Sequence, residues 1–299
     1  MDNIRIVSSP RALRAYTADL RARGIGAIAL DLEADQGSYR YRYSISIFQC
    51  FDGRDAVVID VLALGSELDD LIELLEAPDI AKVMFSAKND LFISQNVLDC
   101  GISPIFDIAV AQKMLGLRVN LSDHLGIDKT KKDGFQRANW LLRPISRELL
   151  AYAAGDVALL LGLEADLRAR LTERRLLDRY LETCAALPGT DYRIDQYRQY
   201  ENKFPGWERL GPGQRELARL IWIFRELVGE HYDCPVGYII STKVLPELLG
   251  SSPDGLAERL EDALNLGRRA EKRIGGAFVR ETLEKARAAI AEGARAPAK

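Results

Sequence analysis

The feature that most constrains the fold is residues 27–33, AIALDLE, a short apolar run that ends in two carboxylates. An uncharged run of small and aliphatic residues after Gly24 and Gly26 predicts a buried β-strand. Alternate side chains of a strand point to the same side of a sheet, so we expect Asp31 and Glu33 to face one direction. Like charges in such a place need a proton or a cation between them, and hard divalent cations prefer oxygen ligands. Taken alone, the pair is equally compatible with a strand that ends in solvated acids.

The composition predicts a globular protein without a membrane segment. The chain has 299 residues, 47% of them hydrophobic, which predicts one large domain and a smaller one. A net charge of −3 gives no overall attraction for nucleic acid, so such a partner needs local basic groups or bound metal ions. The four cysteines are scattered, which argues against a zinc site and favours a reducing compartment. No apolar stretch has signal-peptide or membrane-spanning length, so we expect a cytoplasmic protein.

Residues 1–175 predict an α/β domain with a mixed sheet flanked by helices. Strands are expected near residues 4–7, 27–33, 43–50, 56–61, 82–85 and 105–108, and helices near 10–23, 66–77, 89–98, 109–115, 121–127 and 146–170. Ser66 is the expected cap of the second helix, either Ser86 or Asn89 that of the third, and Ser146 that of the last. Three strands come in succession before helices alternate with strands, which favours a ribonuclease-H-like architecture over a doubly wound one. Residues 129–140 read as a basic, turn-rich excursion.

The remaining sequence predicts a connector followed by a small all-helical module. Residues 176–209 are interpreted as a linker, in which residues 187–203, with the polar run 191–203, are expected to have little core of their own. Residues 210–292 have helical periodicity, broken at Pro235, and short connections, as in a compact bundle. Residues 293–299 are expected to be a frayed tail.

Three residues further along the chain can join Asp31 and Glu33 in one site. Asp90 follows a strand at the start of a helix, where an acid can also simply suit the helix dipole. Asp156 lies in an apolar helix, where an unpaired carboxylate is costly, and Tyr152 lies one turn before it on the same face. Tyr152 alone could be a core aromatic. Together the four carboxylates can surround two Mg²⁺ or Mn²⁺ ions, with Tyr152 holding the water that attacks a phosphodiester.

The order of these motifs resembles the DEDD superfamily of 3′–5′ exonucleases, in the subgroup whose third motif is YxxxD, and within it the ribonuclease D family. The first motif is Asp31-Leu32-Glu33, the second lies in residues 82–90 (KVMFSAKND), and the third is residues 152–156 (YAAGD). Supporting stretches surround Phe106-Asp107 and Trp140 in family order. The resemblance implies an exoribonuclease that releases 5′-nucleoside monophosphates from RNA 3′ ends by a two-metal mechanism.

The resemblance also implies a role for each residue of the site. Asp31, Glu33 and Asp156 would bind one metal ion directly. Asp31 would also bind the second ion, which Asp90 would complete, and Tyr152 would orient the nucleophilic water.

Outside the site, the helical module at residues 210–292 resembles the helicase-and-RNase-D C-terminal (HRDC) domain, which usually aids nucleic-acid engagement. Three residues depart from the usual family pattern: Phe85, where members often have His, and Ala138 and Asn139, where they often have Ser-Asp. None of the three is a metal ligand, so the departures bear on substrate handling rather than on metal binding.

Polar and basic residues supply candidate contacts for a nucleic acid. These candidates are Gln49, Arg40, Arg42, Lys88 and Arg143, of which Gln49 is expected on the same, inward side of strand 43–50 as Ile45 and Ile47. The loop 37–42 and the segment 129–137 offer Arg, Lys and Tyr for phosphates and base stacking, and are equally compatible with solvated surface. The expected partner is RNA with a single-stranded 3′ end.

Two alternatives stay open beside this hypothesis. The enzyme could prefer short oligonucleotides or single-stranded DNA, because a 2′-hydroxyl contact cannot be read from motif spacing. A non-catalytic nucleic-acid-binding protein is the other alternative, and the presence of all five site residues argues against it. Nothing in the sequence identifies a protein partner.

Overall fold

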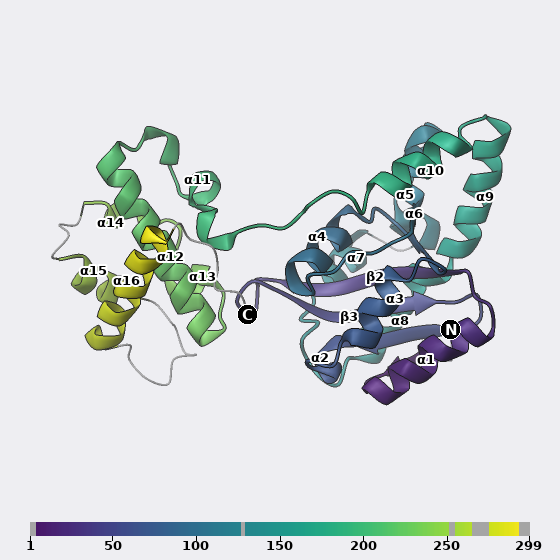
Figure 1. Cartoon of the computed structure of the whole chain (residues 1–299), viewed down its shortest axis with the longest axis horizontal. Helices are drawn as coiled ribbons and strands as arrows, with labels where there is room; N and C mark the ends of the chain where they lie inside the picture. The colour runs from purple at the N-terminus through teal and green to yellow at the C-terminus, as the bar shows by residue number, and fades with distance from the viewer. Residues whose placement is uncertain (1–3, 127–128, 251–254, 265–274, 293–299) are drawn as a thin grey trace. The chain divides into compact units, whose positions relative to one another are not determined.

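The computed structural model describes residues 4–126, 129–250, 255–264 and 275–292 (Figure 1). Contacts divide the chain into two compact units, which are described separately here. The first consists of Met1–Asp35 and Tyr43–Arg193, and the second of Gln36–Arg42 and Ile194–Lys299. The predicted tail at residues 293–299 lies outside the described residues.

The first unit is built on a six-stranded mixed sheet. Its strands are β1 (Ile4–Val7), β2 (Ala27–Gln36), β3 (Tyr43–Phe51), β4 (Ala56–Asp60), β5 (Ala81–Met84) and β6 (Ile105–Asp107). They follow the order β1-β4-β3-β2-β5-β6. The β3–β4 pair is antiparallel, whereas β1–β4, β2–β5 and β5–β6 are parallel. The predicted mixed sheet is therefore confirmed, and β2 lies in its interior between β3 and β5.

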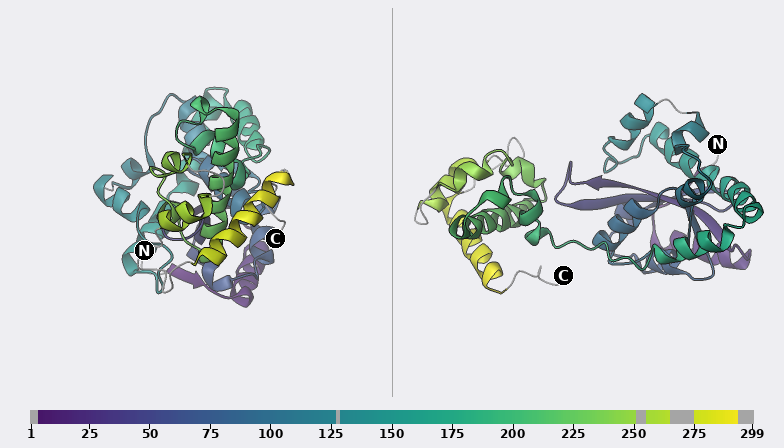
Figure 2. Two further views of the ribbon diagram at one scale, coloured as in Figure 1. Left: turned by 90° about the vertical axis from the view of Figure 1, so that its left-hand side faces the viewer. Right: turned by 90° about the horizontal axis from the view of Figure 1, so that it is seen from above.

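Helices lie on both faces of this sheet, as Figure 2 shows. Side chains of α1 (Pro10–Ala22), α3 (Asp69–Glu76) and α4 (Lys88–Val97) share one core, and those of α5 (Ile108–Met114), α8 (Arg147–Ala158) and α9 (Leu160–Glu173) share another. Successive residues of β2 alternate between these cores: Ile28, Leu30 and Leu32 join the first, and Ala29 joins the second. The strand is therefore buried on both faces.

Local helix starts differ from prediction in two places. The helix expected from Ser66 begins at Asp69 without a side-chain cap, because Asp60 instead caps a separate turn, α2 (Val61–Leu64). The helix expected from Ser86 or Asn89 is α4, and neither residue caps it.

The chain between residues 129 and 186 is more helical than predicted. The short helix expected near 121–127 is α6 (Leu121–Leu125), and α7 (Lys129–Gln136) occupies the stretch expected to be turns. The indole of Trp140 donates to the carbonyl of Phe135 at 3.0 Å and so fixes the end of α7. Ser146 caps α8 as predicted, but α8 ends at Ala158 and α9 is a separate helix.

The segment interpreted as a linker begins with an ordered helix, α10 (Leu177–Ala186). Tyr180 and Cys184 lie one turn apart on α10, and both are buried in the core shared with α5 and α9. The predicted linker 176–209 therefore begins with a packed helix, because this four-residue spacing buries one face of α10. The expectation of little core in residues 187–203 is wrong at Tyr197, which is buried in the core of the second unit.

The second unit is all-helical, as predicted. Its longest elements are α12 (Pro212–Tyr232) and α16 (Gly276–Ala291); the shorter ones are η1 (Gln196–Arg198), α11 (Tyr200–Lys203), η2 (Trp207–Arg209), α13 (Val236–Ile239), α14 (Leu245–Leu248) and α15 (Leu256–Ala263). The core side chains of α12 include Ile221, Phe224 and Val228, which pack with Leu283 of α16.

The loop of residues 36–42 packs into this second unit. The Tyr41 hydroxyl donates to the buried carboxylate of Glu226 at 2.9 Å. The Tyr41 ring lies against Gly229, where an added Cβ would come within 2.9 Å of it. The guanidinium of Arg42 lies over the rings of Tyr41 and Tyr197. Glycine at position 229 is thus required by the close approach of Tyr41.

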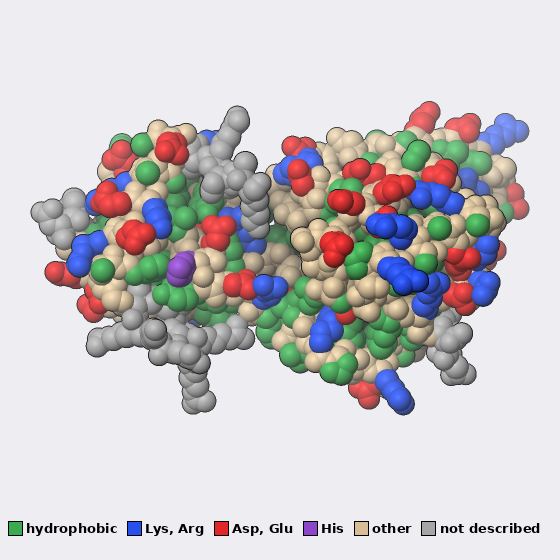
Figure 3. Space-filling view, turned by 60° about the horizontal axis from the view of Figure 1, so that its bottom comes forward, with side chains coloured by type: hydrophobic (Ala, Val, Ile, Leu, Met, Phe, Trp, Pro, Cys, Tyr) green, Lys and Arg blue, Asp and Glu red, His purple; other side chains and the backbone are tan. Residues whose placement is uncertain are grey.

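The surface carries charges of both signs. Figure 3 shows Lys and Arg side chains interspersed with Asp and Glu on the visible face of the first unit, in keeping with the small net charge. No disulfide joins the four cysteines, all of which are buried. Within the described ranges, no helix is long and apolar enough to cross a membrane.

Candidate active site

The central strand β2 presents the first two acids of the site. Because Leu30 and Leu32 point into the core with α1, α3 and α4, the side chains of Asp31 and Glu33 point to the opposite face, beside α8. The apolar alternation thus fixes the direction of both carboxylates. Their predicted common orientation is confirmed.

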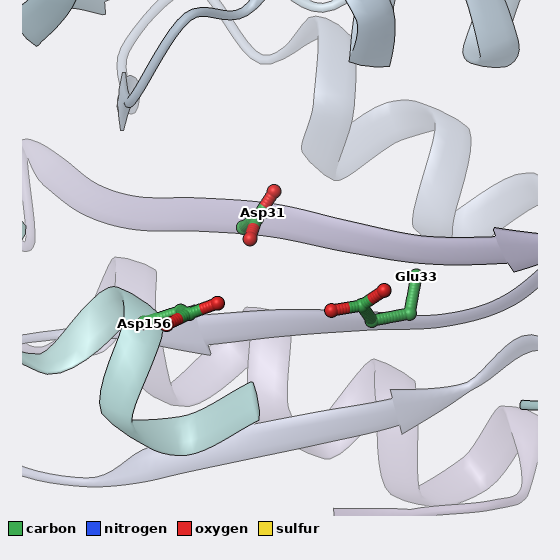
Figure 4. Close-up of side chains that lie close together, drawn as sticks. All are labelled: Asp31, Glu33 and Asp156. Atoms are coloured by element: carbon green, nitrogen blue, oxygen red, sulfur yellow. The ribbon is translucent and has the colours of Figure 1, made fainter. Parts of the chain in front are cut away.

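Helix α8 brings the third acid to the same place. Asp156 is buried in α8, and its carboxylate lies with those of Asp31 and Glu33, so that one oxygen from each falls within 4.8 Å of the others. Figure 4 shows Glu33 and Asp156 directed toward one another with Asp31 beside them. Ala153 and Ala154 are almost completely buried, and such small residues let the helix approach the sheet closely.

Asp90 adds a fourth carboxylate from a third element. It lies in the first turn of α4 and is 7% exposed. Burial, followed by the charge of Asp31, raises its pKa, so its carboxyl lies near that of Asp31. The four predicted acids therefore come together from β2, α4 and α8.

The electrostatics of the cluster favour a cation. Burial, followed by the charge of Asp156, raises the pKa of Asp31 to about 7. Burial and the neighbouring acids, Asp31 first among them, likewise raise the pKa values of Glu33 and Asp90. Among the described residues, no Lys or Arg forms an ion pair with Asp31, Glu33 or Asp90. Clustered oxygen donors held at raised pKa fit a hard divalent ion such as Mg²⁺ or Mn²⁺.

Tyr152 lies beside these carboxylates on α8. Its ring stacks on Phe135 with centroids 4.8 Å apart and lies 6.3 Å from Trp140. Burial, followed by the charge of the nearby Asp156 carboxylate, raises the pKa of its hydroxyl. The side chain is therefore a neutral phenol in a fixed orientation. Sequence reasoning missed Phe135, because residues 129–140 were interpreted as turns rather than as a helix.

Gln49 belongs to the acidic cluster rather than to an exposed surface. It was predicted as a nucleic-acid contact, but it is 0% exposed and its amide donates to Asp31 at 3.1 Å from the neighbouring strand. The alternation of residues 43–50 predicts that Gln49 points inward, and this direction was the sequence signal for its contact with Asp31.

The predicted arginine contacts have partners inside the protein. The guanidinium of Arg143 binds both carboxylate oxygens of Asp60 at 2.7 Å, and acceptors on Ser46, Trp140 and Leu142 take its other N–H groups. Every N–H of Arg143 is thus directed at the protein itself, which leaves none for a phosphate.

The other predicted cationic contacts differ in exposure. In the second unit, Arg40 forms an ion pair with Asp233, and Arg42 lies over two tyrosine rings. Lys88 is exposed at the first position of α4, two residues before Asp90. Lys88 is therefore the predicted cation that shares a helix with an acid of the cluster.

The residues that depart from the family pattern lie outside the carboxylate cluster. Phe85 packs at the edge of the core formed with α5, α8 and α9, and Ala138 packs near Trp140 and Tyr152. The side chain of Asn139 accepts from the backbone of Leu141 at 3.1 Å and holds a turn.

Comparisons with known proteins agree with this geometry. Residues 4–172 match the family model described as "3'-5' exonuclease". The chain belongs to the 3′–5′ exonuclease family. Among its relatives, the exonuclease is 31% identical over 255 residues to ribonuclease D of Xanthomonas oryzae, covering 82% of this chain and 68% of the relative. It is 27% identical over 270 residues to ribonuclease D of Haemophilus influenzae, covering 87% of this chain and 66% of the relative. The predicted ribonuclease D-like membership is confirmed.

Solved structures show the same fold as the exonuclease. Escherichia coli RNase D superposes with a TM-score of 0.69 at 24% identity, covering 95% of this chain and 75% of that one. The catalytic core of RRP6 from Trypanosoma brucei superposes with a TM-score of 0.71 at 22% identity, covering 97% and 80%. The predicted ribonuclease-H-like sheet followed by a helical region is confirmed at the level of the fold.

Proposed function

We propose that this chain is a metal-dependent 3′–5′ exoribonuclease of the DEDDy type, which hydrolyses the last phosphodiester bond of RNA and releases 5′-nucleoside monophosphates. The observation that carries the proposal is the convergence of carboxylate oxygens of Asp31, Glu33 and Asp156 within 4.8 Å, with Asp90 and Tyr152 near enough for these acids to raise their pKa values. The ribonucleases D among its relatives support RNA as the substrate. Because the chain spans only about two thirds of the length of these relatives, their activity is carried over here as a proposal.

The acids divide between two Mg²⁺ or Mn²⁺ ions. Asp31, Glu33 and Asp156 hold one ion, and Asp31 and Asp90 hold the other. When bound, such a pair of ions lowers the pKa of a water and stabilises the leaving 3′ oxygen. The carboxylates themselves fix the direction from which RNA can approach, because they lie on rigid elements of the sheet and of α8.

Tyr152 orients the attacking water. A phenol whose pKa is raised stays neutral, so it can hydrogen-bond the water without adding charge to an anionic site. Stacking on Phe135 restricts the ring. Tyr152 thus positions the water and does not itself take the proton.

RNA with a single-stranded 3′ end is the proposed partner. Lys88 contacts a phosphate beside Asp90, because an exposed cation at that place can offset the charge of the backbone. The second unit acts as an HRDC-like module that engages RNA away from the reacting bond. The proposed location is the cytoplasm.

Asp31→Asn tests this function directly. Asn keeps the size of the side chain but removes the charge that both ions share, so metal-dependent trimming of a 3′-single-stranded RNA is expected to fall by on the order of 10³-fold or more. The matched control is Asp55→Asn, which changes a carboxylate of the β3–β4 turn and should trim normally. Circular dichroism and thermal unfolding check that both variants fold. Retained activity in Asp31→Asn would exclude the proposal.

Substrate class is tested on the wild-type protein. Rates on matched RNA, DNA and dinucleotide substrates, each with Mg²⁺ and with Mn²⁺, separate an exoribonuclease from the two nucleolytic alternatives. We expect the RNA oligomer to be the best substrate. Binding of RNA without any metal-dependent product release would instead support a non-catalytic protein.

A further inference from the structure

A single buried carboxylate connects β6 to the beginning of the helix that carries Asp90. Asp107 is 4% exposed at the end of β6. Its Oδ1 accepts the backbone N–H of Ser86 at 3.0 Å and that of Ala109 at 2.8 Å, and its Oδ2 accepts the N–H of Ala87 at 2.9 Å. Asp107 therefore caps α5, which follows it, and also holds the turn that enters α4.

The turn into α4 has no cap of its own. Ala87 occupies the N-cap position and has no side chain that could accept a hydrogen bond. Ser86 has a φ of 64°, a left-handed conformation that a residue with a side chain rarely adopts. Such backbone persists only where surrounding contacts hold it, and here those contacts come from Asp107.

We infer that Asp107 is a positioning residue for metal binding: it fixes the β5–α4 turn so that Asp90 reaches Asp31. The inference rests on the proposed function for the role of Asp90 as a metal ligand. Asp90 lies only three residues after Ala87, in the first helical turn, so its side chain takes its direction from the backbone that Asp107 holds. Without these bonds, the N–H groups of Ser86 and of the buried Ala87 lose their acceptor, and the first turn of α4 loses its fixed start.

The effect should fall on the metal site rather than on the fold as a whole. Groups that orient a metal ligand without touching the metal typically change metal affinity by about 10- to 100-fold when they are removed. Since Asp90 completes only one of the two proposed sites, we expect the second ion to bind about tenfold more weakly and the first ion to be little affected.

The principal variant is Asp107→Ser. A serine hydroxyl can still cap α5 through Ala109 but is too short to hold the turn that enters α4. The matched control is Asp52→Ser, because Asp52 also accepts two backbone N–H groups, from Arg54 and Asp55, in a different turn. Asp52 also binds the guanidinium of Arg23, so a general loss of stability should be at least as large in Asp52→Ser as in Asp107→Ser.

Mn²⁺ binding to the full chain, measured by calorimetry without RNA, is the main measurement. The expected result is a weaker second ion in Asp107→Ser and unchanged binding in Asp52→Ser, with faster amide hydrogen exchange at residues 86–90 in Asp107→Ser alone. In activity assays, the Mn²⁺ concentration for half-maximal rate should rise about tenfold, while the rate at saturating Mn²⁺ stays within about threefold.

The possible failures are distinguishable. Wild-type Mn²⁺ affinities in folded Asp107→Ser, or an equal loss in Asp52→Ser, would overturn the role of Asp107 whatever the activity. A wild-type chain that binds Mn²⁺ but does not hydrolyse RNA would overturn only the proposed function. If Asp107→Ser does not fold, Asp107→Asn is measured instead, since it keeps Oδ1 and sets an amide against the N–H of Ala87; normal second-ion binding there overturns the inference.

Discussion

Asp60 at the end of β4 and Asp31 in β2 are carboxylates of the same sheet, and the chain surrounds them differently. Both oxygens of Asp60 accept hydrogen bonds from Arg143 at 2.7 Å, so the charge is neutralised within the protein. Asp31 instead receives one neutral amide, from Gln49, and lies beside three further acids. The charge of Asp60 is neutralised by a side chain of the protein, whereas the charge of Asp31 requires a proton or a cation from solution.

This difference distinguishes acids that stabilise the fold from acids that serve function within one sheet. Removing one partner of a buried ion pair leaves an uncompensated charge and destabilises the fold. Removing one acid from a cluster of like charges relieves repulsion, so it costs function rather than stability. Variants of Arg143 and Gln49, and stability measured over a range of pH, test this difference.

The largest expected effect on stability is that of Arg143→Met. Met keeps much of the side-chain length but leaves the carboxylate of Asp60 buried without a cation, so the free energy of unfolding should fall by about 3 kcal/mol. Urea unfolding measures this decrease in the free energy of unfolding. The double variant Asp60→Asn with Arg143→Met should recover part of the loss.

The control for this variant is Arg14→Met, which breaks the exposed ion pair with Asp70 and should change stability little. An equal decrease in the free energy of unfolding of the two arginine variants would mean that the Asp60–Arg143 pair stabilises the fold no more than an exposed pair does.

The next effect is the pH dependence of stability in the absence of metal. Folding raises the pKa of Asp31 from near 4 to about 7, so the folded state keeps a proton that the unfolded state has already released. The contribution of this group to stability is therefore present below pH 4, falls as pH rises toward 7, and levels off above the folded pKa.

Thermal unfolding between pH 5 and 8, with EDTA or with saturating Mg²⁺, measures this slope. A bound cation favours the ionised carboxylate, so the metal-induced rise in melting temperature should increase with pH. Asp31→Asn should flatten the slope in EDTA. A metal effect that is the same at pH 5 and pH 8 would contradict the raised pKa.

The smallest effect is expected for Gln49→Leu. Loss of the amide removes a hydrogen bond that favours the ionised form of Asp31, so the pKa of Asp31 should rise further. We expect roughly a threefold increase in the metal concentration for half-maximal activity at pH 6, and less at pH 8. Equal effects at the two pH values would show that Gln49 does not act through the pKa of Asp31.

The local periodicities of this chain were sufficient to predict much of the site. Alternation in residues 27–33 placed Asp31 and Glu33 on one face, and four-residue spacing placed Tyr152 and Asp156 on one side of a helix. These predictions succeed because strand and helix repeats are properties of the backbone over a few residues. Ser146 was identified as a cap for the same reason, since its bond to Leu149 spans three positions.

Predictions that depended on distant partners were wrong or incomplete. The start of α4 was sought in Ser86 or Asn89, whereas its N–H groups are held by Asp107 from another strand. Arg143 was interpreted as a contact for RNA because an isolated arginine near a motif gives no sign that Asp60, 83 residues earlier, already binds it.

The sequence by itself determined which residue types could make a metal site and which way each would point from its own strand or helix. The tertiary structure alone decided that β2, α4 and α8 meet, that Gln49 lies behind Asp31, and that Asp60 rather than RNA receives Arg143. The physical reason is the range of the interactions. Hydrogen-bond repeats within an element act over three or four residues, whereas the neutralisation of a buried charge depends on whatever side chain the fold brings beside it.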